Sequence, residues 1–284
     1  MRRSRYGYVG SYGRRRGSRV GWVLVLVLLL FVVALSVKRY DYCLPKDVAW
    51  LKTTPIAHRG LHTSELDENS IGAFSNAIAN GYAIELDVRL TKDGHVLVMH
   101  DDELDRLFGI DNKVSNMTLA ELKEIRFPKS GETIPTLAET MAHVAGRTPV
   151  LIEIKNFGLA GKLEEETLKV LEGYHGEYAY QSFGPLSCRW MRQHDDRTPV
   201  GLLLTDFPMM GTRLLRNLKD NFFAAISRPN FISYDYGIIS DEITRGYRDN
   251  GVTILGWTVD DDVLKDKSYL KSVDNVIFEL NAGQ

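Results

Sequence analysis

The chain has 284 residues, of which 44% are hydrophobic and 25% charged, so it is long enough for one large globular domain and its composition excludes global disorder. The formal net charge of −2 is unevenly distributed, because residues 1–39 contain nine basic and no acidic side chains and the remainder contains 26 basic and 37 acidic ones. A domain with so acidic a balance is poorly suited to binding nucleic acid, whereas its carboxylates could serve a cation.

The first predicted element is a transmembrane helix over residues 20–37. These 18 residues carry no charge, are apolar on every face of a helix and are flanked by arginines, which argues against a buried core helix. Their length is close to the minimum for crossing a hydrocarbon core about 30 Å thick. The alternative is a cleaved signal peptide with a cleavage site near Ala34 and Ser36. Because such a peptide usually has an apolar stretch of only about 7–15 residues, we predict an uncleaved anchor.

The charges around this helix predict its orientation. Seven arginines lie within residues 1–19, and only Lys38 and Arg39 follow the helix closely. Because basic residues favour the cytoplasmic side, residues 1–19 are predicted to be a basic cytoplasmic tail of a single-pass protein of the cell membrane, with the rest of the chain outside. Cys43 and Cys188 are too few for a disulfide framework, and we expect them to be unpaired.

After a predicted linker at residues 38–52, residues 53–284 are predicted to form one domain. Apolar segments of strand length alternate there with amphipathic segments of helix length, which predicts a parallel sheet covered by helices. The expected strands are residues 55–58, 83–88, 96–100, 150–154, 178–182, 200–204, 231–234, 253–257 and 275–280. The expected helices include residues 70–79, 119–125, 137–144, 162–174 and 240–249.

One pair of strands departs from this alternation. Residues 83–90 and 95–100 are separated only by residues 91–94, which end in the turn-forming pair Asp93-Gly94. A parallel crossover needs about a dozen residues or more, so these strands must form an antiparallel hairpin. Eight parallel strands then remain, the number that closes a (β/α)8 TIM barrel. An open doubly wound sheet is the alternative, but no Gly-rich dinucleotide loop follows the first strand. We predict an α/β fold, a TIM barrel with an extra antiparallel hairpin strand.

The second strand has two carboxylates on one face. Glu85 and Asp87 are two residues apart and therefore point the same way, while Ile84, Leu86 and Val88 point the other way. Because the apolar face must contact the surrounding helices, both carboxylates are predicted to point into the barrel. Two ionised carboxylates in a poorly solvated site are costly unless they are paired or bind a cation. A pair of surface carboxylates on an edge strand is the alternative, but a closed barrel has no edges.

The next parallel strand repeats the pattern with Glu153 and Lys155. A third inward carboxylate completes an oxygen-rich set that suits Mg²⁺ or Ca²⁺. A buried Glu–Lys ion pair is an equally good interpretation of this strand taken alone.

Two strand ends carry histidine. The first strand ends in His58-Arg59-Gly60, where Arg59 offers two parallel donors to an anionic oxygen. The hairpin's second strand ends at His100-Asp101. Since barrel active sites form at the carboxyl ends of the strands, the two histidines are predicted to share one site, where they suit general acid and base catalysis near neutral pH. The other histidines are interpreted as ordinary loop or helix residues: His62, His95, His143, His175 and His194.

Taken together, these motifs resemble the glycerophosphodiester phosphodiesterase family over residues 53–279. The matching segments, in chain order, are His58-Arg59-Gly60, Glu68-Asn69, Glu85-Leu86-Asp87, Lys92-Asp93-Gly94, His100-Asp101, Glu153-Ile154-Lys155 and Trp257-Thr258-Val259. Each motif is weak alone, but the ordered set is highly specific.

The resemblance implies a TIM barrel that hydrolyses glycerophosphodiesters to sn-glycerol 3-phosphate and an alcohol, with one divalent cation, Ca²⁺ or Mg²⁺. By this resemblance, Glu85, Asp87 and Glu153 hold the cation. His58 and His100 are the acid and base, acting on water or on a neighbouring glycerol hydroxyl, and which does which is left open. Arg59 and Lys155 contact phosphate. Trp257 suits packing on the glycerol moiety and suits core packing equally well.

The sequence departs from the family pattern near its end. Asp260 replaces the usual Asn after Trp-Thr-Val, and Phe278-Glu279 stand where the family has Thr-Asp. Both changes fall at the mouth of the last two strands, so the substrate is less certain than the reaction. A lysophospholipase D or sphingomyelinase D acting on membrane lipids is the alternative. A non-catalytic membrane-bound barrel would require loss of a site residue, and a glycosidase would not explain the two histidines with Arg59 and Lys155.

Overall fold

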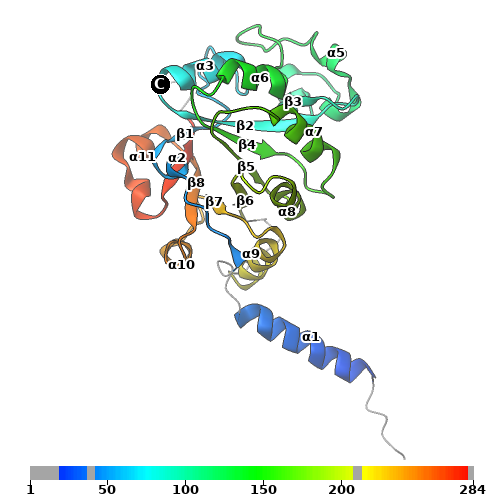
Figure 1. Cartoon of the computed structure of the whole chain (residues 1–284), viewed down its shortest axis with the longest axis vertical. Helices are drawn as coiled ribbons and strands as arrows, with labels where there is room; N and C mark the ends of the chain where they lie inside the picture. The colour runs from blue at the N-terminus through cyan, green and yellow to red at the C-terminus, as the bar shows by residue number, and fades with distance from the viewer. Residues whose placement is uncertain (1–18, 37–41, 207–212, 281–284) are drawn as a thin grey trace, which may run out of the picture. The chain divides into compact units, whose positions relative to one another are not determined.

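The computed structural model describes residues 19–36, 42–206 and 213–280, and it divides into the units Met1–Val37 and Lys38–Gln284 (Figure 1). Within the first unit, α1 (Arg19–Ser36) is a helix over the stretch that the sequence predicts to be helical. The predicted basic tail, apart from Arg19, lies outside the described residues. No helix long and apolar enough to cross a membrane is found among the described residues. The predicted transmembrane segment therefore stays a prediction.

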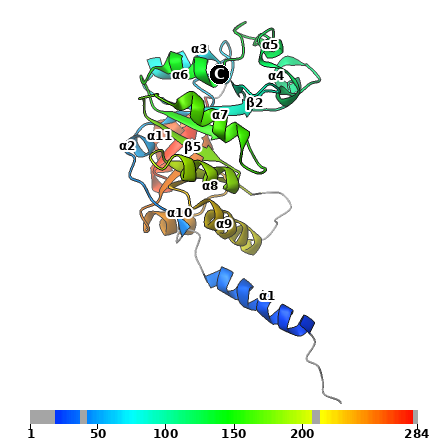
Figure 2. The same ribbon diagram turned by 45° about the vertical axis from the view of Figure 1, so that its right-hand side comes forward.

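The second unit is a closed barrel of eight parallel strands with one extra strand (Figures 1 and 2). The parallel strands are β1 (Ile56–Ala57), β2 (Ala83–Leu90), β4 (Val150–Ile154), β5 (Tyr178–Ser182), β6 (Val200–Leu204), β7 (Phe231–Asp235), β8 (Thr253–Val259) and β9 (Asn275–Phe278). The short β1 closes the barrel by pairing with both β2 and β9. The extra strand β3 (Val96–Val98) pairs antiparallel with the far end of β2. The predicted barrel and its hairpin strand are confirmed.

Helices cover the outside of the barrel. The longer ones are α3 (Ile71–Ala79), α6 (Leu137–Val144), α7 (Lys162–Leu171), α8 (Pro185–His194), α9 (Arg213–Ser227) and α10 (Asp241–Arg248), followed by the short α11 (Asp261–Asp266). Neighbouring helices contact one another in chain order from α6 to α9 (Figure 2). They bury the apolar face of each strand, which on β2 is Ile84, Leu86 and Val88. The other face of each strand must therefore point into the barrel.

The lower half of the barrel interior is sealed by apolar side chains. The helix α2 (Ala49–Thr53) places Trp50 and Leu51 across the amino ends of the strands. They pack on inward side chains of the barrel: Ile56, Ala83, Leu151, Ala179, Phe231, Leu255 and Ile277. Gly201 makes room for one of them, because a Cβ there would lie 2.2 Å from the ring of Phe231. The next inward residues above this floor on β2 and β4 are Glu85 and Glu153.

The predicted linker, residues 38–52, is more structured than expected in its described part. The backbone N–H of Leu44 donates to the carbonyl of Pro229 at 2.8 Å, and Asn230 donates back to the carbonyl of Leu44 at 2.7 Å. Residues 42–53 therefore belong to the bottom of the barrel. Cys43 and Cys188 are both buried, and no disulfide joins these two described residues.

A separate small core fills the connection between β3 and α6. It contains α4 (Asp105–Phe108), the 3₁₀ turn η2 (Val114–Asn116) and α5 (Leu119–Leu122). Its buried side chains are Leu97, Met99, Leu104, Val114, Leu122, Phe127 and Ile134. This insertion begins directly after His100, so it positions the residues that surround that histidine.

Candidate active site

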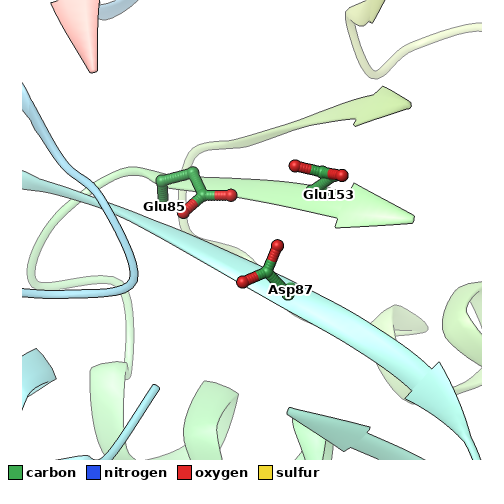
Figure 3. A group of neighbouring side chains, drawn as sticks. All are labelled: Glu85, Asp87 and Glu153. Atoms are coloured by element: carbon green, nitrogen blue, oxygen red, sulfur yellow. The ribbon is translucent and has the colours of Figure 1, made fainter. Parts of the chain in front are cut away.

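Three carboxylates meet inside the barrel just above the apolar floor (Figure 3). Glu85 and Asp87 come from β2, and Glu153 comes from β4 at the position paired with Asp87. All three are buried, and one oxygen of each lies within 4.8 Å of the others. Figure 3 shows their side chains directed toward one space. The period-2 pattern of both strands predicts this grouping, and the parallel register brings the two strands together.

The donor set fits a hard divalent cation. Oxygen Oε1 of Glu85 is buried and has no hydrogen-bond partner among the described residues. A buried charged oxygen without a partner is costly, and carboxylate oxygens are what Mg²⁺ and Ca²⁺ take as ligands. The acidic triad could therefore bind a metal ion, with Glu85, Asp87 and Glu153 as its ligands.

Burial and mutual repulsion destabilise the ionised form of two of these carboxylates, Glu85 and Glu153. Burial, then the charges of Asp87 and Glu153, raise the pKa of Glu85 well above its ordinary value. Burial likewise raises the pKa of Glu153, although Lys155 opposes it. Asp87 behaves differently, since its burial is outweighed by Lys155, His100 and Arg59, which lower its pKa. A bound cation would stabilise the ionised forms of Glu85 and Glu153 more than that of Asp87.

Two positively charged side chains, Lys155 and Arg59, lie beside the three carboxylates. The Lys155 ammonium lies 2.9 Å from Asp87 Oδ1 and 2.5 Å from Glu153 Oε1. Arg59 Nε lies 3.5 Å from Asp87 Oδ2, and its backbone N–H donates to Glu85 Oε2 at 2.9 Å. Two positive charges against three ionised carboxylates leave the cluster with one net negative charge. Lys155 thus forms the buried Glu–Lys ion pair that is one of the two interpretations of this strand from the sequence. It also lies beside the three carboxylates that could hold a metal ion.

The loops that follow β1 fix the backbone around the triad. Arg59 has φ +54° and Asn69 has φ +57°, both in the left-handed region. Asn69 uses this conformation to donate from Nδ2 to Asp87 Oδ2 at 2.9 Å while its Oδ1 accepts from the Asp87 backbone at 3.3 Å. Asn tolerates the left-handed region better than most residues, which explains why it suits this position.

His58 is held by a carboxylate from the opposite end of the domain sequence. Its Nδ1 donates to Glu279 Oε2 at 3.1 Å, and Glu279 Oε1 lies 3.3 Å from His62 Nε2. Burial lowers the pKa of His58, and the hydrogen bond that His58 donates to Glu279 opposes that shift. The two imidazoles in turn lower the pKa of Glu279. His62 lies in a loop, as the sequence predicts, but its side chain is only 10% exposed and contacts Glu279.

His100 is held by its own neighbour and by a chain of ion pairs. Its Nδ1 donates to Asp101 Oδ1 at 2.8 Å, and Arg106 Nε contacts Asp101 Oδ2 at 2.5 Å. Arg106 also pairs with Glu68, to which Arg59 donates at 2.9 Å. Burial lowers the pKa of His100, and the charge of Asp87 opposes the shift. Both imidazoles act electrostatically on Asp87, so they lie around the same cluster.

Trp257 lines the mouth from β8. Its Nε1 donates to the carbonyl of Ser233 at 3.1 Å, and its ring meets Phe183 edge to face with centroids 5.5 Å apart. The side chain is half-buried, so it is part of the wall and still presents surface to a ligand. Asp260, one of the two departures from the family pattern, accepts from the backbone of Val263 at 2.9 Å and caps α11. Its acidic side chain therefore has a local structural role.

Sequence reasoning missed three residues of this site. Glu279 was noticed only as a departure, and its contact with His58 depends on the pairing of β1 with β9. Arg106 lies in the insertion, where no strand pattern indicates the direction of a side chain. His62 follows the His58-Arg59-Gly60 motif by two residues, and that short spacing was the one available signal.

Comparisons with known proteins indicate the same family as the sequence motifs. A family model described as "Glycerophosphoryl diester phosphodiesterase family" matches residues 58–278. A relative from Caldanaerobacter subterraneus subsp. tengcongensis, named glycerophosphodiester phosphodiesterase, is 32% identical over 239 residues, which are 80% of this chain and 94% of that protein.

Solved structures share the fold. A glycerophosphodiester phosphodiesterase from Thermotoga maritima is 30% identical with a TM-score of 0.62, covering 79% of this chain and 94% of the other. An Oleispira antarctica phosphodiesterase, solved with its product sn-glycerol-3-phosphate, is 22% identical with a TM-score of 0.67, covering 80% and 92% of the two chains. The resemblance found in the motifs thus extends over the barrel.

Proposed function

Because this chain belongs to the glycerophosphoryl diester phosphodiesterase family, we propose that it is a phosphoric diester hydrolase that converts glycerophosphodiesters to sn-glycerol 3-phosphate and an alcohol. The observation that supports this most is the convergence of three buried carboxylates with two imidazoles, each imidazole held by a separate carboxylate. That arrangement offers a cation site and two proton-transfer groups around one space, and both assist hydrolysis of a phosphodiester.

One divalent cation, Ca²⁺ or Mg²⁺, is proposed to bind Glu85, Asp87 and Glu153. When bound, it would neutralise charge that builds on the phosphoryl oxygens during the reaction. Lys155 and Arg59 supply positive charge from the chain itself and are placed to bind the non-bridging oxygens of the phosphate. Because both already contact the carboxylates, they are held in place before the substrate arrives.

His58 and His100 are proposed to carry the protons. Each donates through Nδ1 to a carboxylate, Glu279 or Asp101, which leaves Nε2 to exchange a proton with the substrate. One imidazole takes a proton from the attacking hydroxyl as its oxygen bonds to phosphorus. The other gives a proton to the alcohol oxygen as its bond to phosphorus breaks. Burial lowers the pKa of both imidazoles, which favours the neutral form needed by the base.

A direct assay tests this proposal. The full chain in mild detergent is incubated with glycerophosphocholine, glycerophosphoethanolamine or glycerophosphoglycerol, and release of glycerol 3-phosphate is measured with and without EDTA. We expect activity that EDTA abolishes and that added Mg²⁺ or Ca²⁺ restores. Activity that persists after EDTA, or in His58→Ala, would contradict the mechanism.

We also propose that residues 20–37 anchor the chain as a single-pass span in the cell membrane, with the amino terminus in the cytoplasm and the barrel outside. The supporting observations are the 18 uncharged residues and the seven arginines before them. Protease added to intact cells should digest the barrel, and carbonate washing should leave the chain in the membrane fraction. Release by carbonate, or protection of the barrel in intact cells, would contradict the proposal.

A further inference from the structure

One exposed arginine of the insertion joins two carboxylates that come from different loops. Arg106 Nε lies 2.5 Å from Asp101 Oδ2, and its Nη1 and Nη2 donate to the two oxygens of Glu68 at 3.0 Å and 2.5 Å. The planar guanidinium therefore holds Glu68 with a two-pronged fork and Asp101 with a third N–H group. A lysine ammonium is a point charge without this fork, so it could not make all three contacts.

Each of these carboxylates also holds a side chain of the proposed active site. Glu68 Oε1 accepts from Arg59 Nη1 at 2.9 Å, and Asp101 Oδ1 accepts from His100 Nδ1 at 2.8 Å. Arg106 is therefore one side chain away from a proposed phosphate ligand and from a proposed proton-transfer group. These five side chains form one continuous network, called the mouth network below: Arg59, Glu68, His100, Asp101 and Arg106.

The small core of the insertion fixes the backbone of Arg106. Leu104, two residues before it, is fully buried, and its backbone N–H donates to the carbonyl of Asn112 at 2.9 Å. Phe108, two residues after it, packs on Phe127 with ring centroids 5.6 Å apart. The backbone is thus held on both sides, while the side chain of Arg106 is 47% exposed and extends to the mouth network. A small solute can therefore reach this side chain from water.

The two carboxylates depend on Arg106 because both are largely removed from water. The side chain of Glu68 is 13% exposed and that of Asp101 is 24% exposed. Burial alone would raise the pKa of both, but hydrogen bonds from Arg106 act most strongly in the other direction, and both pKa values are lowered. A partly buried carboxylate that loses such a donor must find another partner or turn toward water. Either movement would displace Arg59 or His100.

We propose that Arg106 is a positioning residue for phosphodiester hydrolysis, which fixes Arg59 and His100 relative to each other through the mouth network. This inference rests on the proposed function, in which Arg59 binds phosphate and His100 transfers a proton. Misplacement of a reacting group by about 1 Å can lower the rate about a hundredfold. The role therefore predicts a loss of rate, whereas a residue that only fastens the insertion to the barrel predicts a loss of stability.

The first experiment compares Arg106→Ala with wild type, using the full chain in mild detergent. We expect kcat on glycerophosphocholine to fall about a hundredfold, and both KM and the inhibition constant of glycerol 3-phosphate to rise severalfold. The melting temperature should change by no more than about 3 °C, because the ion pairs of a half-exposed arginine contribute little to stability. Lys113→Ala is the matched control. Lys113 lies in the same insertion and forms an ion pair with Glu103 at 2.8 Å, so its loss should leave all four quantities unchanged.

Chemical rescue distinguishes positioning from a structural role. The side chain removed in Arg106→Ala is half exposed, so guanidinium ion can enter the gap and bind the two carboxylates. We expect millimolar guanidinium to raise kcat of Arg106→Ala about tenfold, with saturation, and ammonium at the same concentration to have little effect. Neither ion should accelerate wild type. Arg106→Lys should recover only part of the lost rate, because an ammonium can hold one carboxylate but not both.

Two further variants test the two arms of the mouth network separately. Glu68→Gln weakens the contact with Arg59, so it should raise KM and the inhibition constant of glycerol 3-phosphate more than it lowers kcat. Asp101→Asn weakens the contact with His100, so it should lower kcat more than it raises KM. Because Arg106 acts through both carboxylates, we expect each of these substitutions to cost less in Arg106→Ala than in wild type.

The possible outcomes separate the two proposals. A wild-type chain that is inactive on every glycerophosphodiester would contradict the proposed function, and the inference about Arg106 with it. An active wild type with kcat of Arg106→Ala within about twofold of it would overturn only the inference. A loss of kcat that guanidinium does not restore, or that accompanies unfolding, would also overturn it, because Arg106 would then only hold the insertion on the barrel.

Discussion

The lower and upper halves of the barrel interior differ completely, although they are two residues apart on the same strands. Ile56, Ala83, Leu151 and Ile277 point inward below, and the next inward residues on those strands are His58, Glu85, Glu153 and Glu279. Two residues of a strand rise about 6.6 Å. Over that distance the interior changes from a packed apolar layer to a cluster of charges.

The two layers contribute differently to stability and to chemistry. The lower layer buries apolar surface and contributes to the free energy of folding, whereas the upper layer buries like charges at a cost. The barrel tolerates that cost because the strands below are already fixed. We therefore expect substitutions in the upper layer to change activity strongly and stability little or favourably, and substitutions below to do the reverse.

The largest expected effect comes from Glu85→Gln. Removing one carboxylate of the triad should lower kcat on glycerophosphocholine about a thousandfold or more, because the cation site and the charge balance of the transition state are both lost. Release of glycerol 3-phosphate measures kcat, and thermal unfolding shows whether the variant is folded. Glu165→Gln, at an exposed glutamate of α7, is the control.

The stability of Glu85→Gln provides a second test, because the direction of its change relative to wild type can be predicted. The pKa of Glu85 in the folded state is raised, so in wild-type protein treated with EDTA this group should make stability fall as pH rises above about 4.5. Gln cannot ionise, so the variant should lack that part of the decline and melt higher than wild type at pH 7. A variant that is both inactive and less stable would contradict the division between the layers.

The next largest effect is expected below, from Phe231→Ala. Phe231 is 1% exposed and fills the floor against Gly201. The substitution should cost about 3–5 kcal/mol of unfolding free energy, or roughly 10 °C in melting temperature, while kcat measured well below that temperature stays near wild type. Phe222→Ala on the exposed face of α9 should change neither quantity. A large loss of kcat in folded Phe231→Ala would show that the two layers are coupled.

The sequence predicted each layer to a different extent. Inward Glu85, Asp87 and Glu153 follow from the alternation of residues along β2 and β4, and the barrel follows from the count of parallel strands. The partner of His58 could not be found in this way. Glu279 is 221 positions away in sequence and reaches His58 only because β1 pairs with β9 when the barrel closes. The direction of Arg106 depends on the packing of the insertion, for which the sequence has no periodic signal.

A smaller effect is expected from Glu279→Gln in the upper layer. The variant keeps an acceptor for His58 but removes the negative charge that opposes the lowering of its pKa by burial. The pKa of His58 should fall further, so the limb of the pH–rate profile that His58 governs should move to lower pH. We expect kcat at pH 7 to fall about tenfold. Asp101→Asn is the matched comparison and should move the other limb, since Asp101 holds His100.

The smallest expected effect comes from His62→Ala, which removes one of the two imidazoles that contact Glu279. Glu279 contacts both His58 and His62, and its side chain is 44% exposed, so water can replace the lost contact. We expect kcat to fall about twofold with little change in KM, because His62 acts through Glu279. His62→Gln, which can still donate to Glu279, should restore the wild-type rate. A loss as large as that of His58→Ala would mean that His62 itself transfers a proton, and the upper layer would then contain three catalytic imidazoles.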